Sequence, residues 1–227
     1  MNSKQLRAVL ALAFALAGCT RDNLGSIEIT GRAAPTDPAN CTFAAGGIRL
    51  LGPVTYDATL GGGMGVVLYV QNHLVDPSTI DPSLLAAAND WRPENVRLRL
   101  NPADYTARYG PSPALPGVTA DAFVPVTVQS ATPGGGEITQ AVSVSASIAS
   151  ALASTAPAGG FPALTRNVVG ITLLGRTGDG DPLETAEWYL PVDVCNGCIK
   201  GGIAACAGAA PEIDTCPVGQ NLPSCIP

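Results

Sequence analysis

The chain has 227 residues, of which 18 are acidic and 12 are lysine or arginine, so its formal net charge is −6. A negative surface repels phosphate, which argues against nucleic acid and anionic lipid headgroups as partners. The 26 glycines and 20 prolines interrupt helices, whereas 46% hydrophobic residues are too many for a disordered chain. The composition therefore predicts a folded, turn-rich domain with one sandwich-sized core.

The first 18 residues have the composition of a signal peptide. Lys4 and Arg7 give a positive start, and an apolar run of ten residues follows at 8–17. A helix needs about 20 apolar residues to span a bilayer, so this run is too short to remain as a membrane anchor. The stretch Leu16-Ala17-Gly18-Cys19 resembles the lipobox of bacterial lipoproteins, a leucine and two small residues before the cysteine that carries the lipid.

That resemblance implies cleavage between Gly18 and Cys19, diacylglycerol on the sulfur of Cys19 and acylation, such as palmitate, of the new amino terminus. After removal of residues 1–18 the chain has ten basic and 18 acidic residues, so its formal net charge is −8. Two or three acyl chains hold a protein firmly on a membrane. In the sorting pattern of such lipoproteins, Thr20 favours the outer membrane. We therefore expect a cell-envelope lipoprotein of the outer membrane, and we expect no cofactor apart from this covalent lipid. The alternative is an ordinary secretory leader with a chance cysteine.

Residues 19–25 are short and polar and predict a tether, and residues 26–194 predict one β domain. In 96–100, Val96, Leu98 and Leu100 alternate with two arginines, which is typical of a half-buried strand. Similar patterns elsewhere complete the set of predicted strands: 26–30, 47–51, 54–57, 65–71, 96–100, 123–129, 138–145, 168–176 and 183–194.

Three connections have recognisable signals. Asp81 and Pro82 suit the cap and first position of a short helix at 81–88. Apolar residues four apart predict a helical turn at 147–152, and the glycines and aspartates of 177–182 suit a hairpin. The proline-rich span 101–122 is weakly patterned, and we expect it to be irregular.

Short strands separated by turns, without a repeating strand–helix alternation, predict antiparallel sheets. The arrangement resembles an immunoglobulin-like or fibronectin-like β-sandwich with one or two short helices. A partly open barrel is the alternative fold.

Residues 195–227 form a cysteine-rich tail with few large apolar side chains, so cross-links would have to replace a core. Its five cysteines and one upstream cysteine make an even set once Cys19 carries lipid, which allows three disulfides in 15 pairings. The oxidising compartment favours these bonds. We hypothesise that Cys41 pairs with a tail cysteine. The disulfide candidates are Cys41, Cys195, Cys198, Cys206, Cys216 and Cys225.

The Cys195-Asn196-Gly197-Cys198 motif has two sharper interpretations than a structural disulfide. A redox pair needs its first cysteine at a helix start, but Asn-Gly favours a tight turn. A zinc site needs four ligands, and the chain has no second CxxC and a single histidine. The segment from Pro191 to Cys198, with Cys216-Pro217-Val218-Gly219-Gln220 and Cys225, resembles the tails of uncharacterised exported bacterial lipoproteins. That resemblance supports export and disulfides and implies no activity.

The remaining candidate residues have simpler explanations. His73 follows a strand without a nucleophile motif nearby and is read as a surface-loop residue. Asp179 and Asp181 share a loop and are weak calcium candidates, although turn chemistry accounts for them. Glu184 and Glu187 lie three apart on a predicted strand, so they point to opposite faces and cannot act as paired acids.

The motifs of common hydrolases and nucleotide-binding proteins do not occur in the sequence. We therefore expect a non-enzymatic envelope lipoprotein whose sandwich binds an envelope protein or a glycan, with the membrane contacted through the lipid. The alternatives are an accessory subunit of an envelope or secretion complex and, with less support, a thiol-redox protein.

Overall fold

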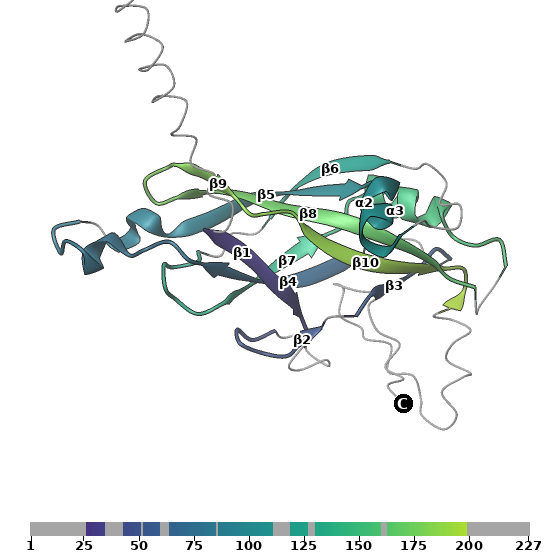
Figure 1. The fold of residues 1–227 in the computed structure, drawn as a ribbon, viewed down its shortest axis with the longest axis horizontal. Coiled ribbons are helices and arrows are strands. Elements are labelled where there is room, and N and C mark those ends of the chain that lie inside the picture. Colours follow the sequence, from purple (N-terminus) through teal and green to yellow (C-terminus); the bar gives the residue numbers. More distant parts are fainter. Residues whose placement is uncertain are drawn as a thin grey trace, which may run out of the picture.

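The computed structural model describes residues 26–34, 43–50, 52–59, 64–84, 86–110, 119–126, 130–159 and 163–198. Within these ranges the chain is mainly β, as predicted, with two sheets and two short α-helices (Figure 1). None of the helices in the described ranges has the length and apolar character to cross a membrane. The predicted leader and tether and five of the cysteines lie outside the described residues: Cys19, Cys41, Cys206, Cys216 and Cys225.

The first sheet has four strands in the order β2-β1-β4-β7, and every neighbouring pair is antiparallel. Each strand overlaps a predicted one, with small differences at the ends. The strands are β1 (Ile27–Ala33), β2 (Arg49–Leu50), β4 (Gly65–Asn72) and β7 (Ile138–Ser143).

The second sheet has six strands, in the order β3-β10-β8-β5-β6, with β9 paired to β8. Its ladders are antiparallel except that β3 runs parallel to β10, so the prediction of purely antiparallel sheets was wrong at this edge. The strands are β3 (Val54–Asp57), β5 (Trp91–Leu100), β6 (Ala120–Pro125), β8 (Thr165–Thr177), β9 (Pro182–Glu184) and β10 (Trp188–Cys195).

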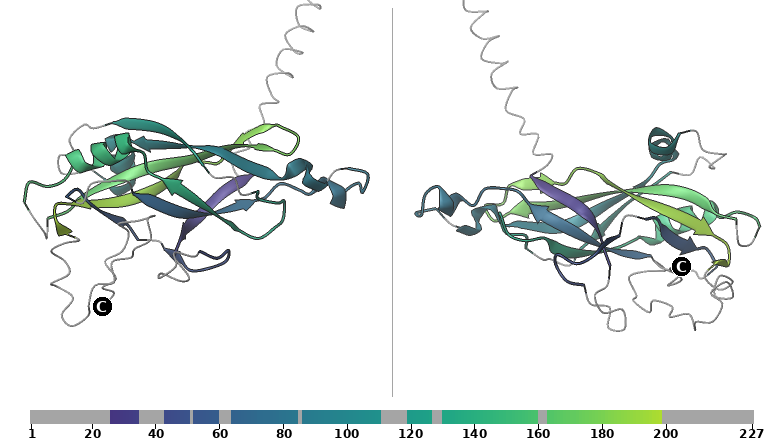
Figure 2. Two further views of the ribbon diagram at one scale, coloured as in Figure 1. Left: turned by 180° about the vertical axis from the view of Figure 1, so that it is seen from behind. Right: turned by 60° about the horizontal axis from the view of Figure 1, so that its bottom comes forward.

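The inner faces of both sheets form one core. Val96, Leu98 and Leu100 are buried there, as the alternation predicts, and they share it with Leu68 of β4 and Ile171 of β8. Burying such aliphatic side chains stabilises a fold by roughly 1.5–3 kcal/mol each. This core holds the two sheets against each other. Figure 2 shows the two facing layers of strands.

The helices correct two predictions. Asn101 caps α2 (Pro102–Tyr109) by accepting a hydrogen bond from the Ala103 amide, so the span 101–122 is not wholly irregular. The predicted helix at 81–88 does not form. Short 3-10 helices, η1 (Pro77–Thr79) and η2 (Ala86–Asn89), flank a turn there.

The helix α3 (Ala146–Ser154) confirms the predicted helical turn. Ser145 caps its start, because its hydroxyl accepts a hydrogen bond from the Ile148 amide. Ile148, Ala149 and Leu152 then join the core from the connection between β7 and β8. The helix therefore covers core residues that the strands leave open.

The hairpin at 177–182 is confirmed, but the strand after it is interrupted. Between the pairs Leu174↔Glu184 and Ile171↔Trp188, β8 advances three residues and its partner four. This extra residue breaks the predicted alternation over 185–187. Thr185 is buried, and its hydroxyl accepts a hydrogen bond from the Leu173 amide.

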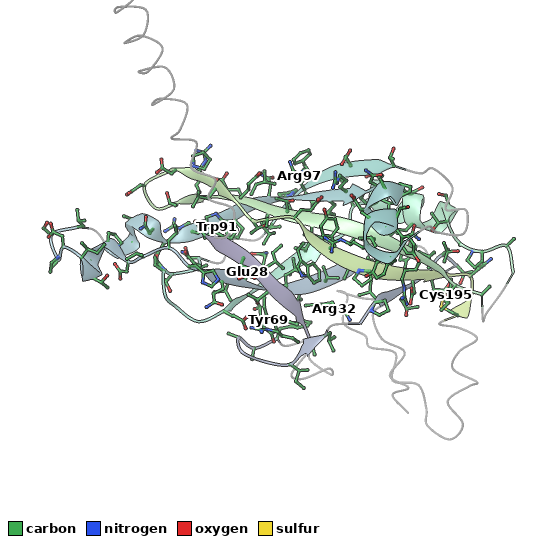
Figure 3. The ribbon with its side chains drawn as sticks, viewed as in Figure 1. Glu28, Arg32, Tyr69, Trp91, Arg97 and Cys195 are labelled. Carbon is green, nitrogen blue, oxygen red and sulfur yellow. A yellow bond between two sulfur atoms is a disulfide. The ribbon has the colours of Figure 1, made fainter. Side chains whose placement is uncertain are left out.

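A bulge in β1 has a larger consequence. The register shifts by one residue between Ile29 and Gly31, which places Arg32 opposite Leu68, on the core side of the sheet. Arg32 is 3% exposed (Figure 3), and its Nη2 donates to the carbonyl of Gly52. Its Nε and Nη1 have no hydrogen-bond partner among the residues that the structure describes, and burial lowers the pKa of the guanidinium to about 10.

Replacing Arg32 with methionine should raise stability, because a buried cation without a carboxylate partner costs more than an apolar chain of similar length. We expect Arg32→Met to increase the free energy of unfolding by about 1–3 kcal/mol in urea titrations. The matched control is Arg97→Met, because Arg97 points outward and donates to the hydroxyl of Thr172. A lower unfolding midpoint for Arg32→Met than for the wild type would show that the guanidinium stabilises the fold.

Candidate functional site

The described end of β10 carries a disulfide between Cys195 and Cys198, two of the predicted candidates. Their Cα atoms are 5.7 Å apart, and Gly197 between them has φ +78°, so the predicted tight turn is present. Figure 3 shows Cys195 at the end of the sheet. The neighbouring strand β3 ends beside this turn, since Cys195 pairs with Asp57.

Asp57 holds the disulfide turn in place. Its carboxylate is fully buried and accepts hydrogen bonds from the Gly197 amide at 2.9 Å and from the amide and hydroxyl of Thr59. The carbonyl of Cys195 accepts from the Ala58 amide at 2.9 Å. The sequence analysis missed Asp57, because a strand-end aspartate reads as an ordinary turn residue.

Among the residues described, Asp57, Cys195 and Cys198 are the one group of three potential metal ligands, with ligand atoms within 4.8 Å of one another. The two sulfurs are bonded to each other, so they are not available as thiolates. Cys195 and Cys198 are 0% and 7% exposed. The geometry is that of a buried cross-link that closes the turn at the end of β10, which Asp57 of β3 holds by a hydrogen bond.

The other predicted residues within the described ranges do not assemble a group of potential metal ligands. His73 lies at the surface with its Nε2 3.1 Å from the Glu28 carboxylate. Asp179 and Asp181 belong to no group of three potential ligands in the described part of the chain. Their loop is closed by the Thr177 amide, which donates to the carbonyl of Asp181 at 2.9 Å.

Glu187 does have a role, although not as a paired acid. Its carboxylate receives two hydrogen bonds from Arg99, from Nε at 2.9 Å and Nη2 at 2.6 Å. The Tyr189 hydroxyl donates to the same carboxylate at 2.6 Å, and Asp104 of α2 lies 3.2 Å from Arg99. Glu184 is exposed and apart from this group. We call Arg99, Asp104, Glu187 and Tyr189, with Arg108 added below, the outer-face network.

The network joins α2 to the outer face of the six-stranded sheet. Burial lowers the pKa of Arg99, but the carboxylates of Glu187 and Asp104 more than offset this and raise it overall. The hydrogen bond to Glu187, together with burial, raises the pKa of Tyr189. Arg108 lies over the Tyr189 ring, with its guanidinium carbon 3.5 Å from the ring centroid.

Aromatic side chains extend this surface along α2. The Tyr105 and Tyr109 rings pack with centroids 5.1 Å apart, and Tyr109 is 50% exposed. On the same face, Arg166 of β8 binds Asp193 of β10 through two hydrogen bonds of 2.6 and 2.7 Å. Tyrosine and arginine held in fixed positions at a surface are typical of protein and ligand interfaces.

A second exposed feature lies at the other end of the molecule (Figures 1 and 2). Residues 73–90, which connect β4 to β5, extend beyond the sheets, and we call them the β4–β5 projection. Asn72 fixes its base with three side-chain hydrogen bonds. It accepts from the Leu74 amide at 2.9 Å and donates to the carbonyls of Asn89 at 2.9 Å and Ala131 at 2.8 Å.

Further contacts fix the interior of the projection. Asp76 caps η1 by accepting hydrogen bonds from the amide and hydroxyl of Ser78. The Asp179 amide donates to the carbonyl of Ala88 at 3.1 Å, which joins the projection to the β8–β9 hairpin. Gly178 is needed at this junction, because a Cβ there would lie 2.0 Å from the Ala87 carbonyl oxygen.

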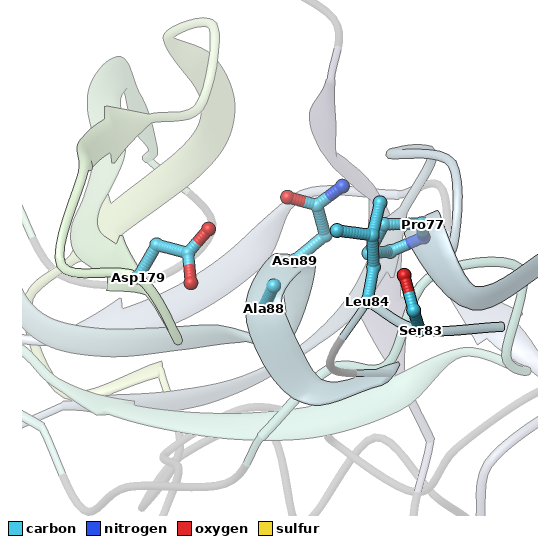
Figure 4. Close-up of a pocket in the computed structure, with 6 residues that line it drawn as sticks. All are labelled: Pro77, Ser83, Leu84, Ala88, Asn89 and Asp179. Atoms are coloured by element: carbon cyan, nitrogen blue, oxygen red, sulfur yellow. The ribbon is translucent and has the colours of Figure 1, made fainter. Parts of the chain in front are cut away.

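Apolar side chains nevertheless point into solvent from this ordered segment. Val75 is 59% exposed, Ile80 77% and Leu84 50%, and we call these three residues the apolar tip. Beside them lies an open hollow of about 300 Å³, shown in Figure 4 and lined by Pro77, Ser83, Leu84, Ala88, Asn89 and Asp179. The sequence offered one signal for the tip, which was the isolated Ile80 between turn residues.

No model of a known protein family matches the chain, and no curated protein is similar to it. The chemistry of the two exposed surfaces is therefore inferred from their own residues.

The outer-face network depends on space at Gly170 of β8. A Cβ there would lie 2.3 Å from Glu187 Oε1, so Gly170→Ala should displace the carboxylate that binds Arg99 and Tyr189. We expect a loss of about 1–3 kcal/mol in the free energy of unfolding. Gly159→Ala is the matched control, since a Cβ at that position would have nothing within 4 Å, and the change should be nearly neutral.

A double-mutant cycle makes the same test specific. If the Glu187 side chain is the cause, Gly170→Ala should cost much less in a Glu187→Ala background. An equal cost in both backgrounds would contradict the proposed contact.

Proposed function

We propose that this chain is a lipid-anchored protein of the bacterial cell envelope, attached through Cys19, that binds a partner and catalyses no reaction. The lipobox pattern at residues 16–19 supports the anchor, and Thr20 favours the outer membrane. The short apolar run of the leader fits removal rather than retention in the bilayer.

The observation that carries the binding role is the aromatic and arginine surface on α2 and the outer sheet face. Tyr109 is half exposed, while Arg108 and Arg166 are held by an aromatic ring and a carboxylate. Side chains that are already ordered lose less conformational entropy on binding. An envelope protein or a glycan is the partner class that suits packed tyrosine rings beside charged hydrogen-bonding groups.

We also propose an immunoglobulin-like or fibronectin-like classification for the sandwich. Two facing sheets, a shared core and mostly antiparallel pairing support it. Such scaffolds commonly present binding surfaces on their loops and sheet faces.

The Cys195–Cys198 disulfide has a structural role in this proposal. Both cysteines are buried, and the Asp57 carboxylate accepts hydrogen bonds from the Gly197 amide and from Thr59. An exchange-active pair needs at least one accessible sulfur. The disulfide would then fix the turn with which the tail leaves β10, beside the end of β3.

The anchor is tested by metabolic labelling with a clickable palmitate analogue. The wild type should take up the label and fractionate with membranes, whereas Cys19→Ser should lose both properties because serine has no thiol to form the thioether. Cys41→Ser is the control and should keep the label. Labelling of Cys19→Ser, or an unlabelled soluble wild type, would favour the ordinary secretory leader.

The binding role is tested by co-purification after mild detergent extraction. Tyr109→Ala should weaken retention of the co-purifying partner by about tenfold or more, the size of a typical aromatic hot spot. Phe123→Ala on β6 is the control, since Phe123 is a 65% exposed aromatic residue on another element. Equal retention of the partner by both variants would show that α2 is not part of the interface. A partner that co-purifies in fixed stoichiometry would favour the accessory-subunit alternative.

A further inference from the structure

The apolar tip is exposed although its backbone is held rigidly. The Asn89 side chain donates to the Val75 carbonyl at 2.7 Å, the Ile80 amide donates to Pro77, and the Leu84 amide donates to Asp81. None of these bonds requires an apolar side chain at the surface. An ordered segment that presents three large aliphatic groups to solvent indicates a surface that is covered when the protein is at work.

The start of the fold lies at the base of the same projection. The His73 amide donates to the Ser26 carbonyl at 2.7 Å, and Ile27 pairs with Asn72. Residues 19–25 are the only chain between Ser26 and the proposed lipid on Cys19. Seven residues span about 25 Å at most. The projection is therefore held close to the bilayer, where even weak apolar contacts are populated because the effective concentration is high.

The charges at the projection end of the molecule indicate which class of lipid headgroup the tip would meet. The projection contains Asp76, Asp81 and Asp90 and no lysine or arginine. The adjoining hairpin adds Asp179 and Asp181 against one cation, Arg176, whose Nη1 donates to the Gly180 carbonyl. Carboxylates are repelled by anionic headgroups. A zwitterionic headgroup instead presents an outward ammonium to these carboxylates, while its acyl region accepts aliphatic side chains.

We propose that the apolar tip enters the interface of a zwitterionic bilayer beside the lipid anchor and fixes the orientation of the sandwich. This inference rests on the proposed lipidation of Cys19, which places the tip at the membrane. Val75, Ile80 and Leu84 supply the buried groups, and the aspartates lie at headgroup level. The α2 surface, toward the other end of the molecule, then faces away from the membrane (Figure 1).

The test places a fluorescent reporter in the tip of the mature lipidated protein. Ile80→Trp and Ile48→Trp are a matched pair, because Ile48 is 72% exposed and lies next to β2, outside the projection. Each is reconstituted in phosphatidylcholine vesicles with or without brominated acyl chains, which quench indole on contact. The emission of the native Trp91 and Trp188 is subtracted with the wild-type protein.

We expect quenching several-fold stronger for Ile80→Trp than for Ile48→Trp. Adding Val75→Ser and Leu84→Ser should reduce the quenching of Ile80→Trp, since the rest of the tip then no longer favours the interface. Admixture of phosphatidylglycerol at low ionic strength should reduce it as well, because the aspartates are repelled. The serine variants should keep the wild-type unfolding midpoint, because the replaced side chains are exposed.

Flotation with the vesicles shows whether the lipid anchor is present, independently of whether the tip contacts lipid. If both tryptophan variants float with the vesicles but neither is quenched, the tip does not touch lipid, and the proposal is overturned in favour of a protein occupant. If the wild type does not float, the anchor itself is absent and the tip proposal fails with it.

Discussion

The two sheets are held together by the burial of their inner apolar faces against each other. Leu98 and Ile171 from one sheet and Leu68 from the other are fully buried in that layer. Because the inner faces are occupied in this way, function has to lie on the outer faces and at the two ends. Two polar side chains that flank Leu68 in this layer, Arg32 and Gln140, keep atoms without a hydrogen-bond partner in the described structure, and the bulge in β1 places Arg32 there.

The two ends of the sandwich differ in chemistry. One end combines the start of the fold with an acidic projection and an apolar tip. Toward the other end, α2 presents two tyrosine rings packed at a tilt and ordered arginines that the outer-face network fixes to the sheet. A protein proposed to be anchored at the first end and to bind at the second needs both features on a rigid body, and the shared core supplies that rigidity.

Much of the fold was predictable because the strand signal is local. The alternation at 96–100, the apolar residues four apart at 147–152 and the turn residues at 177–182 each identify an element without information from elsewhere in the chain. Strand partners are not encoded locally, which is why the parallel β3–β10 pair was missed. The bulge in β1 could not be predicted for the same reason. One extra residue at Thr30 turns the Arg32 side chain to the core face of the sheet, and the sequence pattern gives no sign of it.

The predictions for 81–88 and 101–122 failed for a related reason. Asn101-Pro102 and Asp81-Pro82 carry the same start signal, but only the first continues into an α-helix, with Arg108 and Asp104 making contacts to the sheet. The candidate sites were harder still, because both exposed surfaces combine residues far apart in sequence. Glu187 was singled out for a pairing with Glu184, whereas its partner Arg99 lies 88 residues away.

In the proposed orientation, the β4–β5 projection contacts the membrane and α2 faces away from it. Hydroxyl-radical footprinting of the lipidated protein on phosphatidylcholine vesicles, compared with the soluble Cys19→Ser protein, tests this at both ends in one measurement. The account predicts that vesicles protect Ile80 and Leu84 from oxidation and leave Tyr109 as reactive as in solution. Protection of Tyr109 with full reactivity of Ile80 and Leu84 would contradict it.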